Sequence, residues 1–227
     1  MKRIPGMRLS GNLLLLGLIT GLSAVMVSEA WAQVKPGLAI VPFFVEKRED
    51  PARGALCPIC RGAYRTGDIQ PGAEQILTRL LYQKMEPSGT FRVVPSERVE
   101  EVLCGKSKKE LEEKILALAP SLGKDLGAEF LFLGYLFRFE ERVGSSLGVE
   151  KPASVGFDLH LLRVKDARIV WTTKFDETQR PLSENILKIG SFFRRGASWL
   201  KAEELASVGM GEVLKALPSP QELEEKK

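Results

Sequence analysis

The sequence predicts an α/β (α+β) fold, in which helices pack on a mixed β-sheet. A nearly continuous apolar run at 38–44 is typical of a buried central strand. Segments with helical periodicity then alternate with short apolar runs, as they do in βαβ units. From residue 129 onward, strand patterns follow one another directly and indicate a meander. The expected order of elements is β-α-β-α-α-β-β-β-α-α.

The N-terminal segment has the three parts of a secretory signal peptide. Basic residues come first, an apolar run spans 13–27, and Ala30-Trp31-Ala32 offers the small residues that a signal peptidase accepts. We therefore expect cleavage after Ala32 and export to the periplasm. An uncleaved membrane anchor is the alternative, because the uncharged stretch 9–28 is just long enough to span a bilayer.

Removal of residues 1–32 leaves 195 of the 227 residues, a length that predicts one domain, at 33–218, with a charged tail at 219–227. The removed segment holds three basic residues and one acidic residue, so the net charge falls from +4 to +2. A charge this small argues against nucleic acid as a partner. No lipid anchor is expected, because the first cysteine is Cys57, far beyond the apolar run. The sequence leaves a homo-oligomer open.

A long loop and a helix follow the first strand. The segment 46–70 is polar, rich in turn residues and contains the pair Cys57 and Cys60. Loops of this length inside a domain usually have a function or move. A helix is predicted over 73–86, because apolar residues recur there at helical spacing. Its expected core face consists of Ile76, Leu77, Leu80, Leu81 and Met85.

Two further helices are expected after a brief strand at 91–94. Ser96 is predicted to cap the first, because a serine side chain can accept a hydrogen bond from an N-terminal backbone N–H. Ser107 and Glu110 have the spacing of a capping box for the second. Pro120 lies within that helical pattern and is expected to kink or end it.

Two strands of the second half show clear alternation. Along 129–140, Tyr135, Phe137 and Phe139 are expected to share one side. Along 154–164, Phe157, Leu159 and Leu161 point to the core side. The opposite, polar side of that strand carries Asp158 and His160.

The chain is expected to end in a hairpin and two helices. A tight connection at 165–168 leads into a strand at 169–175, which pairs back on the preceding strand. The last two helices are predicted at 182–189 and 202–217. The charged residues 219–227 are expected to fray.

Four stretches in this order resemble one superfamily of bacterial envelope proteins. They are GLAIVPFF, FRVVPSERVEEVL, LGAEFLFLGYL and LLRVKDARIVW. The succession is similar to that in the curli secretion channel CsgG, the amino-terminal domain of TolB and the penicillin-binding-protein activator LpoB. It covers about 37–175. The resemblance implies an α/β domain in a non-enzymatic envelope protein that binds other proteins.

The motif Cys57-Pro58-Ile59-Cys60 is the sharpest local feature, and it has several interpretations. A covalent haem site needs a histidine next, and Arg61 stands there. A thioredoxin-type dithiol needs a helix N-terminus, and the glycine-rich residues that follow do not predict one. A disulfide between Cys57 and Cys60 suits an oxidising compartment. A zinc knuckle, with Cys104 or His160 as further ligands, is another hypothesis. Free thiols and a bond that involves Cys104 also stay open.

Catalysis is not expected. His160 is the only histidine, so a Ser-His-Asp or Cys-His assembly would have to be built around it, and no telling serine or cysteine motif lies nearby. We interpret His160 as a solvated or hydrogen-bonded residue on the polar side of its strand. The glycines have neither phosphate-loop nor dinucleotide spacing, so no nucleotide cofactor is expected.

The favoured hypothesis is a non-enzymatic periplasmic adaptor without a cofactor, acting by protein–protein binding in cell-envelope assembly or secretion. The alternative is a protein that binds zinc, or performs thiol redox chemistry, through Cys57 and Cys60. Under the first hypothesis, the partner is another envelope protein.

Overall fold

The computed structural model describes residues 35–46, 54–145, 148–179 and 199–226. They belong to one compact unit formed by Val34–Lys227. The predicted signal peptide at 1–32, its cleavage site and the predicted helix at 182–189 lie outside the described residues. Among the helices that are described, none combines the length and the apolarity needed to cross a membrane.

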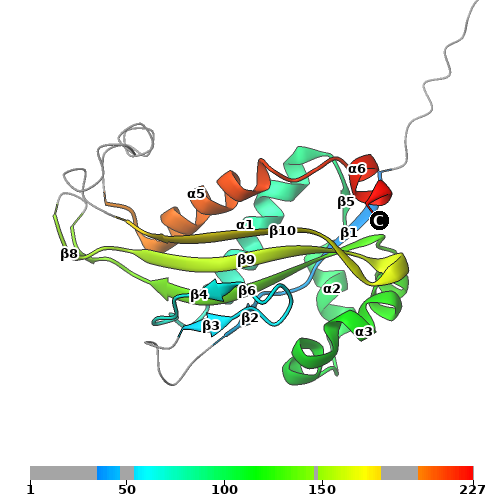
Figure 1. Ribbon diagram of the computed structural model, residues 1–227, viewed down its shortest axis with the longest axis horizontal. Coiled ribbons are helices and arrows are strands. Elements are labelled where there is room, and N and C mark those ends of the chain that lie inside the picture. Colours follow the sequence, from blue (N-terminus) through cyan, green and yellow to red (C-terminus); the bar gives the residue numbers. More distant parts are fainter. Residues whose placement is uncertain (1–34, 47–53, 146–147, 180–198, 227) are drawn as a thin grey trace, which may run out of the picture. The chain divides into compact units, whose positions relative to one another are not determined.

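A mixed six-stranded sheet forms the centre of this unit, which confirms the predicted fold class (Figure 1). Its main strands run in the order β10-β9-β6-β1-β5, and β2 pairs with β6. Strands β1, β5, β6 and β2 pair with one another in parallel, whereas β9 pairs antiparallel with both β6 and β10. The strands are β1 (Gly37–Ile40), β2 (Phe44–Val45), β5 (Arg92–Val93), β6 (Phe130–Glu140), β9 (Ser154–Arg163) and β10 (Arg168–Thr178).

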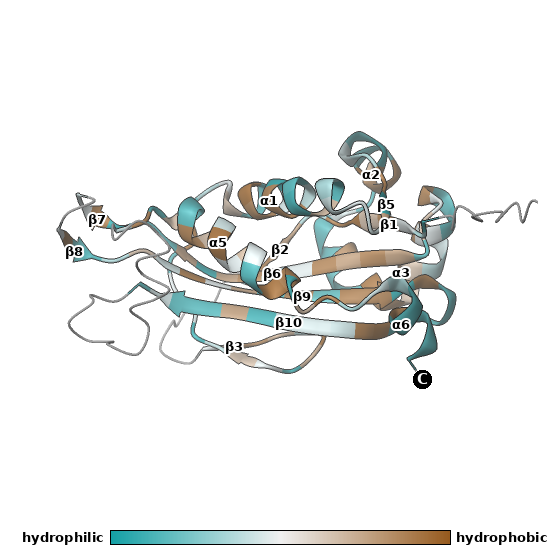
Figure 2. Ribbon diagram, turned by 90° about the horizontal axis from the view of Figure 1, so that it is seen from above, coloured by the Kyte–Doolittle hydropathy of each residue, from teal (hydrophilic) through white to brown (hydrophobic). Residues whose placement is uncertain are grey.

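Helices cover both faces of the sheet (Figures 1 and 2). One face packs against α1 (Ala73–Ser88) and α5 (Ala202–Leu214), and the other packs against α2 (Ser96–Leu103) and α3 (Lys108–Leu126). The second face also carries a small hairpin. It consists of β3 (Ala55–Leu56) and β4 (Ala63–Tyr64), which pair within the segment predicted to be a loop. A further short hairpin joins β7 (Val143–Gly144) to β8 (Val149–Lys151).

The predicted apolar faces match the core with one exception. Residues Phe157, Leu159 and Leu161 of β9 face α1 and α5, as expected. Along β6, however, Tyr135 and Phe137 face the α3 side, whereas Phe139 faces the α1 side. The pairing with β9 shifts register between Leu136 and Arg138, so Phe137 is an extra residue that reverses the alternation.

Two of the predicted helix boundaries differ in the structure, and a third is confirmed. Ser96 is the first residue of α2, and Pro95 occupies the N-cap. Helix α3 continues through Pro120 to Leu126, where its last turns still bury apolar side chains against the sheet. Ser107 does cap α3 by accepting a hydrogen bond from the Glu110 N–H at 3.0 Å.

The expected frayed tail contains an ordered helix, α6 (Pro220–Glu225). Ser219 and Glu222 form a capping box at its start. Its Leu223 is fully buried, and the Arg163 guanidinium donates to the backbone carbonyls of Leu223 and Glu224. A buried apolar anchor and a paired charge therefore hold this segment to the sheet.

Candidate metal centre

The turn between β3 and β4 holds both cysteines of the Cys-Pro-Ile-Cys motif. The Cys57 N–H donates to the Gly62 carbonyl at 2.9 Å, and the Arg61 N–H donates back to the Cys57 carbonyl at 3.0 Å. Arg61 has φ of 61°, the left-handed conformation that L-residues adopt rarely. These constraints close a tight knuckle that leads into strand β4, so the cysteines do not begin a helix as a thioredoxin-type dithiol does.

Backbone N–H groups of the knuckle point at both sulfur atoms. The Cys57 Sγ accepts from the N–H of Ile59 at 3.3 Å and from the N–H of Cys60 at 3.4 Å. The Cys60 Sγ accepts from the Gly62 N–H at 3.4 Å. Such donors favour the charged form of a sulfur ligand, because each aligns a positive partial charge with the thiolate. The knuckle therefore presents two sulfur atoms on one turn, each with backbone donors beside it.

Strand β9 supplies two more donor groups to the same place. Asp158 and His160 are two residues apart, so they share the face that the hairpin covers, and both are fully buried. The His160 Nε2 lies 3.2 Å from the Cys57 Sγ and 3.2 Å from the Asp158 Oδ1. The Cys60 Sγ lies 3.9 Å from the Asp158 Oδ2. One ligand atom from each of the four residues lies within 4.8 Å of all the others.

The three individual separations, 3.2 to 3.9 Å, are close to the edges of a coordination tetrahedron. Zinc–ligand distances of about 2.0–2.3 Å require ligand atoms roughly 3.3–3.8 Å apart in a tetrahedral site. Two cysteines, one histidine and one carboxylate are all ligand types that zinc accepts. The four residues consequently match zinc in number, chemistry and spacing.

The buried polar groups of the cluster would be stabilised by a bound cation. The Asp158 Oδ1 is buried and makes no hydrogen bond among the described residues, although the His160 Nε2 lies 3.2 Å from it. A buried carboxylate oxygen without a hydrogen bond is costly, and a metal ion at the centre of the cluster would reduce that cost. Burial, followed by the neighbouring Asp158, raises the pKa of the Cys57 thiol. A bound metal cation reverses this effect, because coordination deprotonates a thiol.

Neighbouring side chains that contact the four candidate ligands hold them in place. The His160 Nδ1 lies 3.0 Å from the Thr172 Oγ1 on β10, which leaves Nε2 directed at the cluster. Tyr64 stacks on Phe137 with the ring centroids 4.0 Å apart. Burial raises the pKa of Tyr64, as do the charge of Asp158 and a hydrogen bond with it. The hairpin thus contacts the strand ligands through an aromatic side chain as well as through its thiols.

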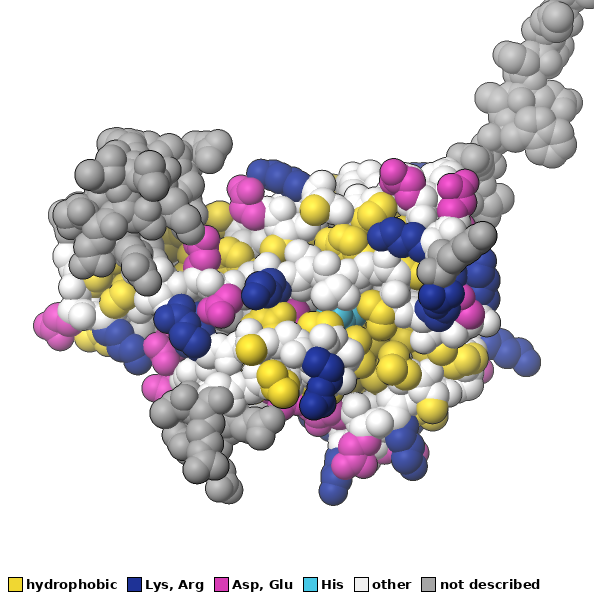
Figure 3. Space-filling view, viewed as in Figure 1, with side chains coloured by type: hydrophobic (Ala, Val, Ile, Leu, Met, Phe, Trp, Pro, Cys, Tyr) yellow, Lys and Arg dark blue, Asp and Glu magenta, His cyan; other side chains and the backbone are white. Residues whose placement is uncertain are grey.

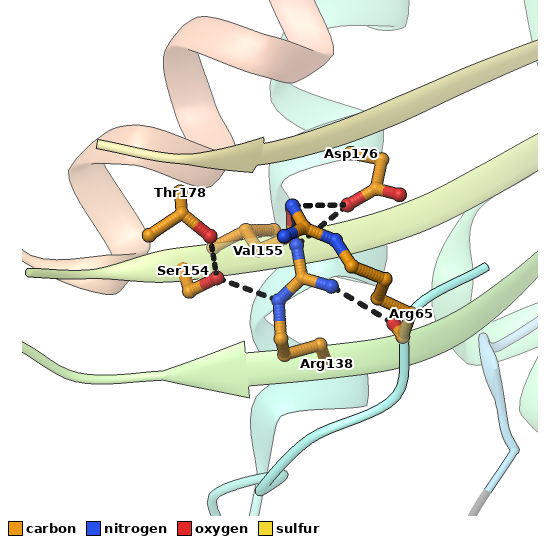
Figure 4. Close-up of polar contacts among 6 residues, drawn as sticks. All are labelled: Arg65, Arg138, Ser154, Val155, Asp176 and Thr178. Atoms are coloured by element: carbon orange, nitrogen blue, oxygen red, sulfur yellow. Dashed lines mark hydrogen bonds and ion pairs between the residues drawn. The ribbon is translucent and has the colours of Figure 1, made fainter. Parts of the chain in front are cut away.

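A buried arginine holds the chain just beyond the hairpin (Figure 4). The Arg138 guanidinium donates to the Arg65 carbonyl at 2.8 Å, to the Ser154 Oγ at 2.6 Å and to the Asp176 Oδ1 at 2.6 Å. A Cβ at Gly67 would lie 2.8 Å from the Arg138 side chain, so this close approach needs glycine. The arginine ties the segment after β4 to three neighbouring strands and keeps the knuckle over the sheet.

We expect Thr172→Val to weaken zinc binding by about tenfold or more, because the valine cannot hold the His160 ring by its Nδ1. Competition with a colorimetric zinc chelator measures the affinity. Thr172→Ser keeps a hydroxyl and should bind zinc nearly as the parent chain does. Thr173→Val serves as the matched β10 control, and equal affinities for all three variants would exclude an orienting role for Thr172.

The structure brings some of the predicted site residues together and leaves one of them outside. It brings His160 together with Cys57 and Cys60, but Cys104 is an exposed residue at the end of α2 and does not belong to the cluster. His160 is fully buried rather than solvated. All three cysteines are free, so the predicted Cys57–Cys60 disulfide is not seen. The two thiols instead face the histidine and the carboxylate.

Sequence reasoning missed Asp158 as a ligand. The signal was present, since Asp158 and His160 alternate with apolar residues and so share one strand face. The pattern does not reveal that a distant hairpin covers this face and makes it an interior surface.

Comparison with known proteins establishes no relationship for this chain. Its sequence matches no protein-family model and no curated protein. Similar solved structures include a PelC dodecamer from Paraburkholderia phytofirmans, with 12% identity, a TM-score of 0.45, and coverage of 82% of this chain and 90% of that one. The lipoprotein GNA1162 from Neisseria meningitidis is 12% identical, with a TM-score of 0.44. The match covers 71% of this chain and 96% of that one.

The LpoB C-terminal domain from Salmonella enterica is also similar, with 13% identity, a TM-score of 0.39, and coverage of 64% of this chain and 84% of that one. All three likenesses are too distant to assign a family or a function. The function is therefore argued from the site itself.

Proposed function

We propose that this chain is a zinc protein in which one Zn²⁺ joins the β3–β4 knuckle to β9. The ligands are Cys57, Cys60, Asp158 and His160. The observation that carries the proposal is the convergence of four suitable donor atoms within 4.8 Å of one another. The buried Asp158 Oδ1 supports it, because this oxygen makes no hydrogen bond and a cation beside it would offset its buried charge.

The proposed role of the metal is structural. Four protein ligands complete a tetrahedron, whereas catalytic zinc sites keep one position open for water or substrate. The cluster also joins segments about a hundred residues apart in sequence, as a cross-link does. We therefore infer that the protein is not an enzyme and that zinc fixes the shape of a binding domain.

We infer further that this domain acts by protein–protein contact in the periplasm, in envelope assembly or secretion. Two sequence features support this step: the signal-peptide pattern at 1–32 and the ordered stretches that resemble envelope proteins. Basic and acidic side chains are intermixed on the face shown in Figure 3, so this face lacks the continuous basic surface that nucleic acid would require.

Metal analysis of the purified chain tests the zinc proposal. One zinc per chain is expected, and Cys60→Ser or His160→Ala should reduce this to nearly none. Cys104→Ser is the matched control, because Cys104 is an exposed cysteine outside the cluster, and it should keep the metal. Cobalt substitution should give the intense visible absorption of a tetrahedral thiolate site. A metal-free protein with a Cys57–Cys60 disulfide in mass spectrometry would contradict the proposal.

A further inference from the structure

The two cysteines of the candidate metal centre differ in their exposure to solvent. Cys57 is fully buried, whereas Cys60, on the same turn, is exposed. The other two candidate ligands, Asp158 and His160, are also fully buried. Cys60 is therefore the ligand that a reagent in solution meets first, and the hairpin need not unfold for this contact.

The buried and the exposed sulfur atoms lie close together. The Sγ atoms of Cys57 and Cys60 lie within 4.8 Å of each other, and the Cys60 N–H donates to the Cys57 Sγ at 3.4 Å. A disulfide needs its sulfur atoms about 2.05 Å apart, so the two atoms must approach each other by less than about 3 Å. Rotation of the Cys60 side chain can supply most of this movement, because Cys57 belongs to the core and Cys60 does not.

Zinc binding would keep both sulfur atoms in their reactive form. A cysteine that binds zinc is a thiolate, and the thiolate is the form that attacks a disulfide. The Gly62 N–H, 3.4 Å from the Cys60 Sγ, also favours a negative charge on that sulfur. An exposed thiolate beside a buried one suits a two-step exchange, in which the first reacts with a reagent and the second completes the disulfide.

We propose that Cys60 is a site of thiol–disulfide exchange, through which a disulfide compound releases the zinc. This inference rests on the zinc site proposed above. In the first step, the Cys60 thiolate attacks one sulfur atom of the compound, forms a mixed disulfide and expels the other sulfur as a thiolate. In the second step, the Cys57 thiolate attacks the Cys60 Sγ, closes the Cys57–Cys60 disulfide and expels the remaining thiolate.

The two steps balance without a further reactant. Both cysteines are oxidised, and the incoming disulfide takes up their two electrons and leaves as two thiolates. Zinc then retains only Asp158 and His160 of its four ligands, and it dissociates because structural zinc sites require four. The hairpin loses its link to β9 when the metal leaves. Oxidation therefore changes the surface that the domain offers to a partner.

Oxidised glutathione, added to the reduced and zinc-loaded protein, tests this inference. The test uses Cys104→Ser protein, because the exposed Cys104 would also react and lies outside the cluster. We expect the zinc content to fall from one per chain to nearly none, with one Cys57–Cys60 disulfide formed for each zinc released. A zinc indicator and mass spectrometry follow the two products. Reduction with dithiothreitol, followed by added zinc, should restore the loaded protein.

Two double variants test the order of the steps. Cys57→Ser in the Cys104→Ser protein should accumulate a mixed disulfide with glutathione at Cys60, because no second thiol displaces it. Cys60→Ser in the same background leaves the buried Cys57, which should react at least tenfold more slowly. Circular dichroism shows whether both variants are folded. Equal rates for two folded variants would overturn the assignment of Cys60 as the first site of attack.

The zinc measurement separates failure of this inference from failure of the zinc site. A loaded protein that keeps its zinc in oxidised glutathione would overturn the exchange at Cys60 and leave the zinc site standing. A reduced protein without zinc would refute both proposals. This comparison needs no substitution at a ligand, so it holds even if the double variants fail to fold.

Discussion

Cys57→Ser is expected to lower the free energy of unfolding of the zinc-loaded protein by about 4 kcal/mol. Zinc at a free concentration 1,000 times its Kd stabilises the folded chain by about that amount. The variant loses this contribution because an alcohol is a poor zinc ligand compared with a thiolate. Chemical denaturation of both proteins in the same zinc buffer measures the difference.

A chelator gives the control for this prediction. EDTA should lower the stability of the parent chain to nearly that of Cys57→Ser and leave the variant unchanged. Cys104→Ser should respond to EDTA as the parent does, because its sulfur lies outside the cluster. Hydrogen exchange should show the loss of protection first at the Cys57 and Arg61 amides, whose bonds close the knuckle. If EDTA has no effect on the parent chain, no structural metal is present.

Phe157→Ala is expected to destabilise the protein by about 3–5 kcal/mol, as other buried phenylalanine truncations do. The Phe157 ring is fully buried on the α1 and α5 face of the sheet. It contacts Phe43 edge-on with the centroids 6.1 Å apart, and it lies 5.5 Å from the ring of Phe175. Its removal opens a cavity that three rigid strands cannot close. The loss of unfolding free energy is measured as a shift of the chemical-denaturation midpoint, with the slope of the free energy against denaturant concentration unchanged.

Two further variants bracket this effect. Leu80→Ala removes a smaller buried side chain from the same core, so we expect a loss of about 2–5 kcal/mol. Val143→Ala truncates a side chain that is 50% exposed on β7, and a change within about 0.5 kcal/mol is expected. Similar midpoints for Phe157→Ala and Val143→Ala would show that the β9 core face is assigned wrongly.

Local patterns predicted most of the fold because they depend on neighbouring residues. The apolar stripe of helix 73–86 and the alternation along 154–164 both match the core. Local patterns gave the wrong answer where contacts with residues distant in the sequence determine the conformation. Phe139 changes face because β6 bulges against β9, and α3 passes Pro120 because packing beyond it outweighs one lost hydrogen bond.

The sequence by itself determined the two pieces of the candidate metal site, a Cys-Pro-Ile-Cys turn and a strand face that carries Asp158 and His160, but it did not single out Asp158 as a candidate ligand. Only the tertiary structure decided that these two pieces meet, that Cys104 stays outside, and that the lone histidine is interior. The reason is physical, because a turn and a strand separated by a hundred residues approach each other only through packing of the hairpin on the sheet. The aromatic stack of Tyr64 on Phe137 and the buried Arg138 supply that packing.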